Sequence, residues 1–372
     1  MENTSPNIGW LFYKDYYNTS REEEVFIKVE RRNVKRIAPL SLTEEGKEDA
    51  AINEKIFEKR NQHLIQQIRP QSIPAEYPTP QNPFKIIPLE TKGQGLLIGS
   101  GYNHGSGASG EIEIGFFFDH TTGLPTIPGA SVKGVMRSIF PGRLTEAANQ
   151  AAKQAERFEK TGKTDKAKPL IAKSTYYLKL ADDRYYFLIH LLSKVLGIQD
   201  FENLESIEDQ RAFIDELENE IFEGRFKTQK RDEDNNWVYQ EMSIYERDIF
   251  HDGLLVKSDH PALPIQRCPA GAILGMDFIT PHKNRKSDNF PDQLKNPLPI
   301  SFIKVLPKVR FNFQFDLKEE YSIEVVDENN IRRREKRNRL LSITEREKLF
   351  EAVLTTKGIG AKTNVNFGKL QK

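Results

Sequence analysis

Val309-Arg-Phe-Asn-Phe-Gln-Phe-Asp-Leu317 is the stretch of sequence that most clearly decides the fold. Its apolar side chains alternate with polar ones, and a period of two is typical of a β-strand that buries one face. We therefore expect a sheet with one face covered by other elements. A hairpin is predicted directly after this strand, with residues 321–326 paired to residues 331–334 around an Asp-Glu-Asn-Asn turn.

The chain downstream of this hairpin predicts a helix over residues 344–356. Thr344-Glu-Arg-Glu347 has the spacing of a capping box, and Gly358 is placed to end the helix. A short strand over residues 364–370 is predicted to follow. The central strand is thus succeeded by a helix and one more strand.

Upstream, short strand-like runs surround a second helix. Residues 94–100 and 111–118 are predicted to be strands around a glycine-rich turn. Residues 131–140 are predicted to form a helix with one apolar face, with Ser131 as its N-cap and Pro141 at its end. This gives a strand, helix and strand order on the N-terminal side as well.

A long helical block separates these two halves. The pattern is helical from about residue 143 to residue 223, and we interpret it as a block of helices inserted into the framework of strands and helices. An exposed hairpin is predicted next, with residues 227–231 and 237–241 around an Asp-Glu-Asp-Asn-Asn turn.

Residues 1–92 are predicted to be an N-terminal extension of a core that covers residues 93–372. The extension contains an aromatic cluster from Trp10 to Tyr17 and a helical stretch over residues 43–69, followed by a proline-rich connector from Pro70 to Pro88. We expect the apolar residues of the extension to dock onto the rest of the fold.

The whole order is strand, helix, strand, strand, helix, strand with large insertions. It predicts an α+β class with a ferredoxin-like core, the arrangement of an RNA-recognition motif.

Composition excludes several classes of protein. With 37% hydrophobic residues and 55 basic against 54 acidic residues, the 372-residue chain is not a disordered polyelectrolyte. A single cysteine, Cys268, excludes an internal disulfide and a zinc site of paired cysteines, and the seven histidines match no ligand spacing. No apolar run is long enough to cross a bilayer. We expect a cytoplasmic protein with no metal, no cofactor and no membrane partner.

The charges are distributed unevenly although they nearly cancel. Residues 201–223 hold nine acidic residues and one arginine, whereas residues 332–339 hold six basic residues and one glutamate. Because a polyanion responds to local patches, the net charge does not exclude RNA binding. The acidic stretch is interpreted either as repelling RNA from one surface or as docking onto a basic neighbour.

Two glycine-rich segments are the strongest candidates for contact with phosphate. Residues 105–110 have the spacing of a dinucleotide fingerprint, but a strand rather than a helix is predicted after them. Residues 358–363 resemble a phosphate loop but lack a glycine before Lys362 and a helix after it. Both segments can present backbone N–H groups to phosphates, and for the second we prefer this interpretation over a mere tight turn.

Other polar residues allow two interpretations each. Lys133 and Arg137 lie one helical turn apart and form either a solvated face or a pair that binds consecutive phosphates. His104 is the one candidate general base for metal-independent RNA cleavage, but we prefer a role as a polar loop residue or an RNA contact.

Two motifs at opposite ends of the core carry a family resemblance. Leu124-Pro-Thr-Ile-Pro-Gly-Ala-Ser-Val-Lys-Gly-Val-Met-Arg137 is similar to the "IPGSSLKGxxR" signature of RAMP-superfamily CRISPR proteins, with Ala130 in place of the first serine. Gly358-Ile-Gly-Ala-Lys-Thr-Asn-Val-Asn-Phe-Gly368 resembles the C-terminal "GxGxKTxxGYG" loop of that superfamily, with Asn366 and Phe367 in place of a glycine and the tyrosine.

Three further segments narrow the resemblance. Asp248–Asp252, Asp277–His282 and Asn296–Phe302 resemble the sixth-subunit family of type III-B (Cmr) effector complexes, and so does the Trp10–Tyr17 segment. Such a resemblance implies a non-catalytic backbone subunit that holds the 3′ part of the CRISPR RNA and helps to position target RNA. The implied partners are CRISPR RNA, target RNA, neighbouring RAMP subunits and the small helical subunit.

The resemblance also implies which residues contact RNA, without reading its sequence. They are Asn103, His104, Gly105, Gly107, Ser131, Lys133, Arg137, Lys357, Gly358, Gly360, Lys362, Thr363 and Asn364. Two other functions stay open at this point. One is a metal-independent endoribonuclease that processes precursor CRISPR RNA, since that enzyme family shares the fold and the glycine-rich loop. The other is an assembly scaffold with little RNA contact.

Overall fold

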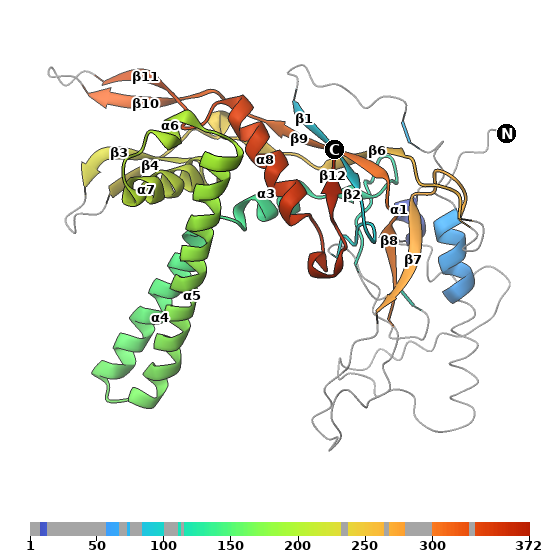
Figure 1. The fold of residues 1–372 in the computed structure, drawn as a ribbon, viewed down its shortest axis with the longest axis horizontal. Helices are drawn as coiled ribbons and strands as arrows, with labels where there is room; N and C mark the ends of the chain where they lie inside the picture. The colour runs from blue at the N-terminus through green and yellow to red at the C-terminus, as the bar shows by residue number, and fades with distance from the viewer. Residues whose placement is uncertain are drawn as a thin grey trace.

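A central antiparallel sheet organises the molecule (Figure 1). The computed structural model describes residues 8–12, 57–66, 73–74, 84–99, 111–112, 115–231, 237–263, 268–279, 300–326 and 332–372. The strand order is β12 (Leu370–Gln371), β1 (Lys85–Thr91), β9 (Val309–Asp316), β6 (Gly253–Ser258) and β2 (Thr126–Ile127), and β5 (Ile249–Phe250) also pairs with β9. The α+β class is therefore confirmed.

The predicted alternation of β9 is confirmed. Its residues are buried and half-buried in turn, and the buried set faces a layer made by α3 (Gly129–Arg137) and α8 (Ile343–Lys357). Phe315 of β9 lies 5.0 Å from the ring of Phe350 on α8, and α3 buries Val132 and Met136 in the same core. The phenylalanines of β9 thus bind both helices to the sheet.

The first strand of the sheet is β1, and its predicted position at residues 94–100 was wrong. Residues 94–99 contain a single bridge, between Leu96 and Val305, while β1 lies in what was predicted to be the proline-rich connector. Pro88 is tolerated there because it occupies an exposed position of the strand, paired with Asn312 of β9 only. The predicted boundary after residue 92 therefore assigns β1, a strand of the central sheet, to the N-terminal extension.

The helix caps differ from those predicted. The capping box of α8 is formed by Ser342 and Glu345, two residues before the predicted pair. Helix α3 begins at Gly129 rather than with Ser131 as N-cap, and the Gly129 N–H donates to Asp252 Oδ1 at 2.7 Å. The Asp252 carboxylate, which is distant in sequence, therefore accepts a hydrogen bond from the first N–H group of α3. The sequence near the helix does not reveal this partner.

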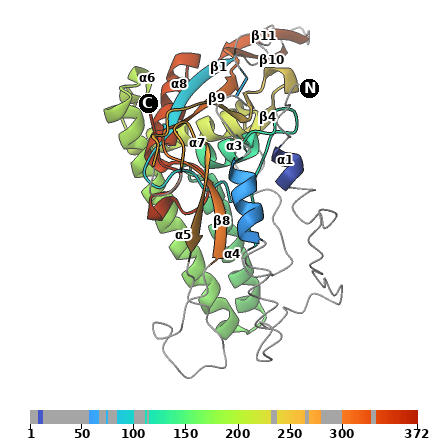
Figure 2. The same ribbon diagram turned by 90° about the vertical axis from the view of Figure 1, so that its right-hand side faces the viewer.

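Helices fill the segment where the insertion was predicted, and part of this segment projects from the sheet as an arm (Figures 1 and 2). The elements of the segment are α4 (Gly142–Lys160), α5 (Thr164–His190), η3 (Leu191–Val195), α6 (Gln199–Glu202), α7 (Ile207–Glu218) and η4 (Asn219–Glu223). Helices α4 and α5 pack against each other along the arm. None of the helices in the described ranges is long and apolar enough to cross a membrane.

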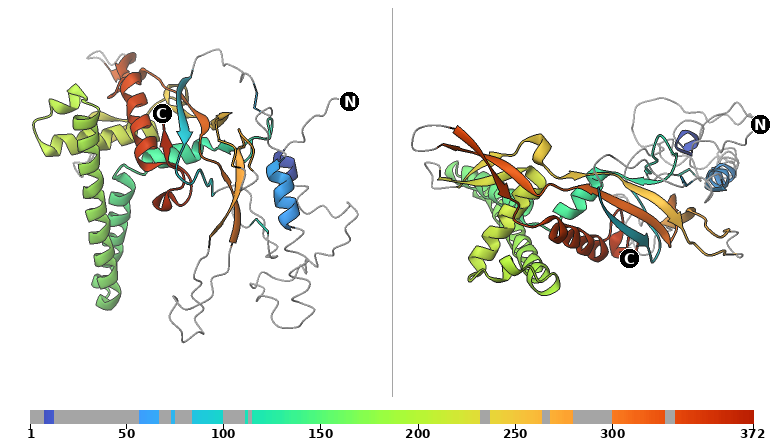
Figure 3. Two further views of the ribbon diagram at one scale, coloured as in Figure 1. Left: turned by 45° about the vertical axis from the view of Figure 1, so that its right-hand side comes forward. Right: turned by 90° about the horizontal axis from the view of Figure 1, so that it is seen from above.

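Both predicted hairpins are present and pack together beside α7 (Figure 3, right). They are β3 (Arg225–Arg231) with β4 (Trp237–Glu241), and β10 (Glu320–Val326) with β11 (Arg332–Asn338). Phe226, Met242, Tyr321 and Ile323 form a small core between them. A third pair, β7 (Leu274–Ile279) with β8 (Ile300–Val305), extends from the other side of the sheet.

The described part of the N-terminal extension docks onto the core as expected. Phe12, which follows α1 (Ile8–Trp10), lies 5.4 Å from Phe118, and the helical residues 57–66 bury Phe57 and Leu64 in the main core. The rest of the predicted helix and aromatic cluster lies outside the described residues.

Two predicted strands were wrong in the ranges that the structure describes. Of residues 111–118 the structure describes 111–112 and 115–118, and these form isolated bridges, such as those of Ile112 and Phe118, rather than a strand. Residues 363–365 form a 3₁₀ turn, η8 (Thr363–Val365), and pairing begins only at Leu370. In each case other backbone contacts replace a regular ladder.

Two buried ion pairs join segments that lie far apart in the sequence, and the second of them joins the insertion to the core. Arg346 of α8 binds Asp248, and both side chains have an exposed fraction of 0%. Arg339 lies beside Glu220 of the insertion, with Nη1 3.8 Å from Oε1, and the Leu340 N–H donates to the same carboxylate at 3.2 Å. The acidic stretch thus docks onto basic neighbours within the chain.

The Glu220 carboxyl makes stability depend on pH. Burial raises the pKa of Glu220 to about 7, against the opposing attraction of Arg339. Since the folded state keeps this proton to a higher pH than the unfolded chain, its contribution to stability falls as the pH rises from about 4.5 to about 7.

We expect the stability advantage of the wild type over Glu220→Gln to shrink by up to about 3 kcal/mol between about pH 5 and pH 8. Urea unfolding of both proteins across this range measures the difference. An advantage that grows with pH would instead show that attraction to Arg339 outweighs burial.

Candidate nucleic-acid interface

The C-terminal glycine-rich loop, residues 358–369, closes on the segment that follows β1. The Ala361 N–H donates to Leu97 O at 2.8 Å, and the Gly368 N–H donates to Gly95 O at 2.7 Å. A further bond joins the Lys92 N–H to Lys369 O at 2.9 Å. Main-chain contacts between residues 92–99 and the loop therefore fix the shape of the loop.

Two glycines of this assembly are required by close backbone approach. Gly368 has a φ of +63°, and a Cβ atom there would lie within 3.0 Å of the Ile359 carbonyl oxygen. Gly95 has a φ of +85°, and its Cβ atom would lie equally close to Val305 O. These glycines serve packing, as the tight-turn interpretation holds for them. The same close approach applies at Gly358 and Gly360, where Cβ atoms would lie within 3.0 Å of Gly368 O and Leu97 O, so phosphate contact by these two glycines stays a prediction.

The side chains at the tip of the loop point to solvent. Lys362 and Asn364 are exposed, and Thr363 is half-buried. Lys362 adopts a φ of +58°. Asn366, which stands where the related motif has glycine, has a φ of +71°, a conformation that asparagine tolerates better than most residues. Phe367 is buried against Phe302 with 5.8 Å between ring centroids, and it anchors the loop.

The described chain that leads toward the second predicted glycine-rich segment packs against this loop. Gly99 packs against Ala361, and residue 100 follows directly. Asn103, His104, Gly105 and Gly107 lie outside the described residues, so their RNA contacts stay a prediction. What the structure shows is that Gly99 and Ala361, which lie 262 residues apart in sequence, pack against each other.

Lys357 lies at the end of α8, just before the loop. Its Nζ is 4.6 Å from the centroid of the Phe187 ring on α5, a cation–π geometry. Burial, followed by the nearby charges of Arg184 and Lys369, lowers the pKa of Lys357. The insertion therefore reaches the base of the glycine-rich loop.

Lys133 and Arg137 are engaged with the insertion. Arg137 Nε donates to Glu218 Oε1 at 3.2 Å, and its Nη2 binds Glu223. Lys133 Nζ lies 5.9 Å from the centroid of Phe250, and burial lowers its pKa. Ser131 is half-buried in the first turn of α3. For Arg137 the structure thus shows carboxylate partners where phosphates were predicted.

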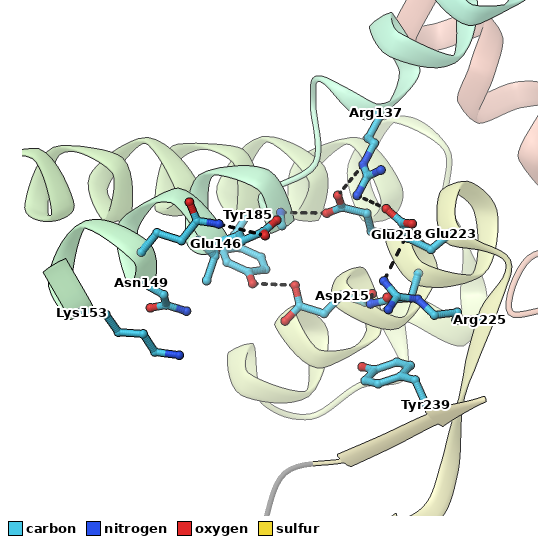
Figure 4. Close-up of a pocket in the computed structure, with 14 residues that line it drawn as sticks. Arg137, Glu146, Asn149, Lys153, Tyr185, Asp215, Glu218, Glu223, Arg225 and Tyr239 are labelled. Atoms are coloured by element: carbon cyan, nitrogen blue, oxygen red, sulfur yellow. Dashed lines mark hydrogen bonds and ion pairs between the residues drawn. The ribbon is translucent and has the colours of Figure 1, made fainter. Parts of the chain in front are cut away.

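Arg137 also lines a cleft of about 600 Å³ between α4, α7 and the β3–β4 hairpin (Figure 4). Tyr185 points toward Asp215 and donates to Oδ1 at 2.6 Å, and burial raises the pKa of both groups. Burial also raises the pKa of Glu218, which accepts from the Gly142 N–H. Carboxylates on several walls make this cleft unfavourable for a phosphate.

The histidines considered for a metal site do not converge where they are described. The His251 ring stacks on Phe84 with 4.2 Å between centroids, and His260 Nδ1 lies 3.0 Å from Pro307 O. A search of the described residues finds no group of three potential metal ligands.

Sequence reasoning missed two basic residues, Arg184 and Lys369, whose charges act on Lys357. Arg184 belongs to the insertion and is part of no recognisable motif. The one signal in the sequence is that Arg184 lies three residues before Phe187, because side chains with this spacing share a face of a helix.

The chain belongs to the RAMP superfamily, whose sequence profile matches residues 89–371. It is also similar to a chain in a solved structure, the cryo-EM structure of the Type III-B Cmr-beta bound to cognate target RNA. That similarity has a TM-score of 0.36 and 14% sequence identity, and it covers 88% of this chain and 73% of the other. No curated protein matches the sequence.

Proposed function

We propose that this chain is a non-catalytic RNA-binding backbone subunit of a cytoplasmic type III-B (Cmr) effector complex. In this role it holds the 3′ part of the CRISPR RNA and helps to position target RNA. Membership of the RAMP superfamily over residues 89–371 supports the proposal, together with the resemblance of Asp248–Asp252 and Asp277–His282 to the sixth-subunit family.

The strand order supports a ferredoxin-like core. Counted along the chain, the four strands β1, β6, β9 and β12 have the spatial order fourth, first, third, second, and all their pairings are antiparallel. Helix α3 lies between the first and second of these strands, and α8 lies between the third and fourth. This is the order expected of an RNA-recognition motif with insertions.

The C-terminal loop is the observation that carries the RNA-binding proposal. Backbone bonds to residues 92–99 hold it in place, and its exposed side chains are Lys362, Asn364, Val365 and Asn366, with Thr363 half-buried among them. Within the described residues, Lys362 forms no ion pair, so its charge is available to a phosphate. Contacts of this kind bind any sequence, as a protein that carries varied guides requires.

The α4–α5 arm provides a surface for protein partners. Ile171, Tyr176, Leu178 and Tyr186 are exposed on α5, with exposed fractions of 45%, 59%, 46% and 59%. A neighbouring RAMP subunit or the small helical subunit would cover these apolar side chains in the assembled complex.

We expect Lys362→Gln to weaken binding of a labelled single-stranded RNA by about fivefold to tenfold, the loss of one charge-assisted contact. The slope of log K against log[salt] should fall by about 0.7. Lys166→Gln, an exposed lysine on the arm, is the matched control and should bind as the wild type does. Fluorescence anisotropy at several salt concentrations measures both quantities.

Other outcomes favour the other functions. RNA that is cut during the titration, with cutting lost in His104→Ala, would identify a processing endoribonuclease. RNA affinity that is weak and nearly independent of salt in the wild type would identify an assembly scaffold.

A further inference from the structure

Three basic side chains from different parts of the chain lie at the base of the C-terminal loop, close enough for the charges of Arg184 and Lys369 to act on Lys357. Arg184 lies one turn before Phe187 on α5, and the Lys357 ammonium lies over the Phe187 ring at 4.6 Å. Lys369 is the last residue of the loop and directly precedes β12. The side chains of all three are half-buried rather than fully solvated.

The described residues place no carboxylate in an ion pair with these three cations. Two acidic groups on the same elements are already paired elsewhere. Asp182 binds Arg211 at 3.0 Å, and Glu351 binds Lys372 at 2.8 Å. Burial, followed by the charges of Arg184 and Lys369, lowers the pKa of Lys357. No carboxylate is among the causes of this pKa shift.

Several other half-buried cations among the described residues are paired with carboxylates. Arg137 binds Glu218 at 3.2 Å, Lys227 binds Glu216 at 2.5 Å, and Lys304 binds Asp277 at 2.6 Å. Like charges that are held together and partly removed from water destabilise the free protein, and a bound anion removes this penalty. The cluster therefore has the electrostatics of a preformed anion site.

We propose that Arg184, Lys357 and Lys369 form a phosphate-binding site that continues the C-terminal loop and takes the phosphodiester backbone of RNA. This inference rests on the proposed RNA-binding function. An RNA backbone is favoured over an acidic protein segment because the cluster is continuous with the loop. Lys357 directly precedes Gly358, and the Lys369 carbonyl accepts the Lys92 N–H at the base of the loop.

The site gives the helical insertion a second role. Arg184 is the contribution of α5, so the insertion touches RNA near its root while its arm is free to contact protein. The guanidinium has the fork geometry that binds phosphate through two N–H groups, which an ammonium cannot reproduce.

The test compares Arg184→Gln with Lys179→Gln, an exposed residue five positions earlier on the same helix. The probe is a labelled single-stranded RNA of mixed sequence. Arg184→Gln is expected to weaken binding about fivefold to tenfold and to reduce the salt slope by about 0.7, whereas Lys179→Gln leaves both unchanged. Arg184→Lys should restore the salt slope and only part of the affinity. Thermal unfolding of each variant checks that the fold is intact.

The outcomes separate this inference from the function on which it rests. If Lys362→Gln weakens binding but a folded Arg184→Gln does not, the cluster is not an RNA site and the proposed function stands. If neither variant changes binding or its salt slope, both proposals fail. If Arg184→Gln loses binding of an acidic protein partner instead of RNA, the cluster is a protein-docking site and the inference is wrong.

Discussion

Gly368→Ala is expected to lower the free energy of unfolding by about 3–5 kcal/mol, among the largest effects of any single substitution in this chain. Two penalties add at this position. The residue has a φ of +63°, and the new methyl group would lie within 3.0 Å of the Ile359 carbonyl oxygen. Backbone on both sides of the contact leaves little room for relaxation, because Gly368 also donates its N–H to Gly95.

Gly162→Ala is the matched control for this prediction. Gly162, in the turn between α4 and α5, has a φ of +71°, yet no atom of the described residues lies within 4 Å of the new Cβ position. Gly162→Ala is expected to lower the free energy of unfolding by about 1–2 kcal/mol, the cost of the left-handed backbone conformation alone. Urea unfolding followed by circular dichroism measures both variants. Equal losses would show that close approach of the backbone is not what requires Gly368.

Arg346→Met is expected to destabilise the protein by about 3–5 kcal/mol. Arg346 and Asp248 both have side chains with an exposed fraction of 0%. Arg346 also donates to Lys318 O at 2.6 Å, and Asp248 accepts from the Lys318 N–H at 3.0 Å. Removal of the arginine leaves a buried carboxylate with one remaining backbone donor among the described contacts.

A double-mutant cycle tests the mechanism of this loss. Asp248→Asn combined with Arg346→Met removes both charges, so the pair should be less destabilised than the sum of the single variants. Lys336→Met is the exposed control, since Lys336 pairs with Glu320 at 2.8 Å while its side chain is 75% exposed. It should leave stability nearly unchanged, because solvent screens an exposed ion pair. Additive losses in the cycle would rule out a buried charge as the cause.

Much of the fold was predictable because its signals are local. The alternation along Val309–Asp316 depends only on which side chains face the core, and the two hairpins follow from the turn residues between their strands. The position of β1 was not predictable in this way. Pro88 argues against a strand unless one knows that only β9 pairs with the chain at that point.

The same difference between local signals and long-range contacts applies to the candidate site. The C-terminal loop was predictable from its glycines and basic residues, because a motif contiguous in sequence carries it. Other features of the site depend on how the insertion packs against the core. They are the ion pair of Arg137 with Glu218 and the action of the Arg184 charge on Lys357. No local pattern encodes contacts between residues that far apart.

The glycine-rich loop also has a consequence for how the protein can evolve. Its shape is set by main-chain bonds to residues 92–99, whereas its outward side chains make few contacts within the protein. Substitutions at Lys362, Asn364 or Val365 can therefore tune the charge of the loop with little loss of stability. Different residues therefore determine the RNA affinity of the loop and its backbone structure, so evolution can change the affinity while the structure is kept.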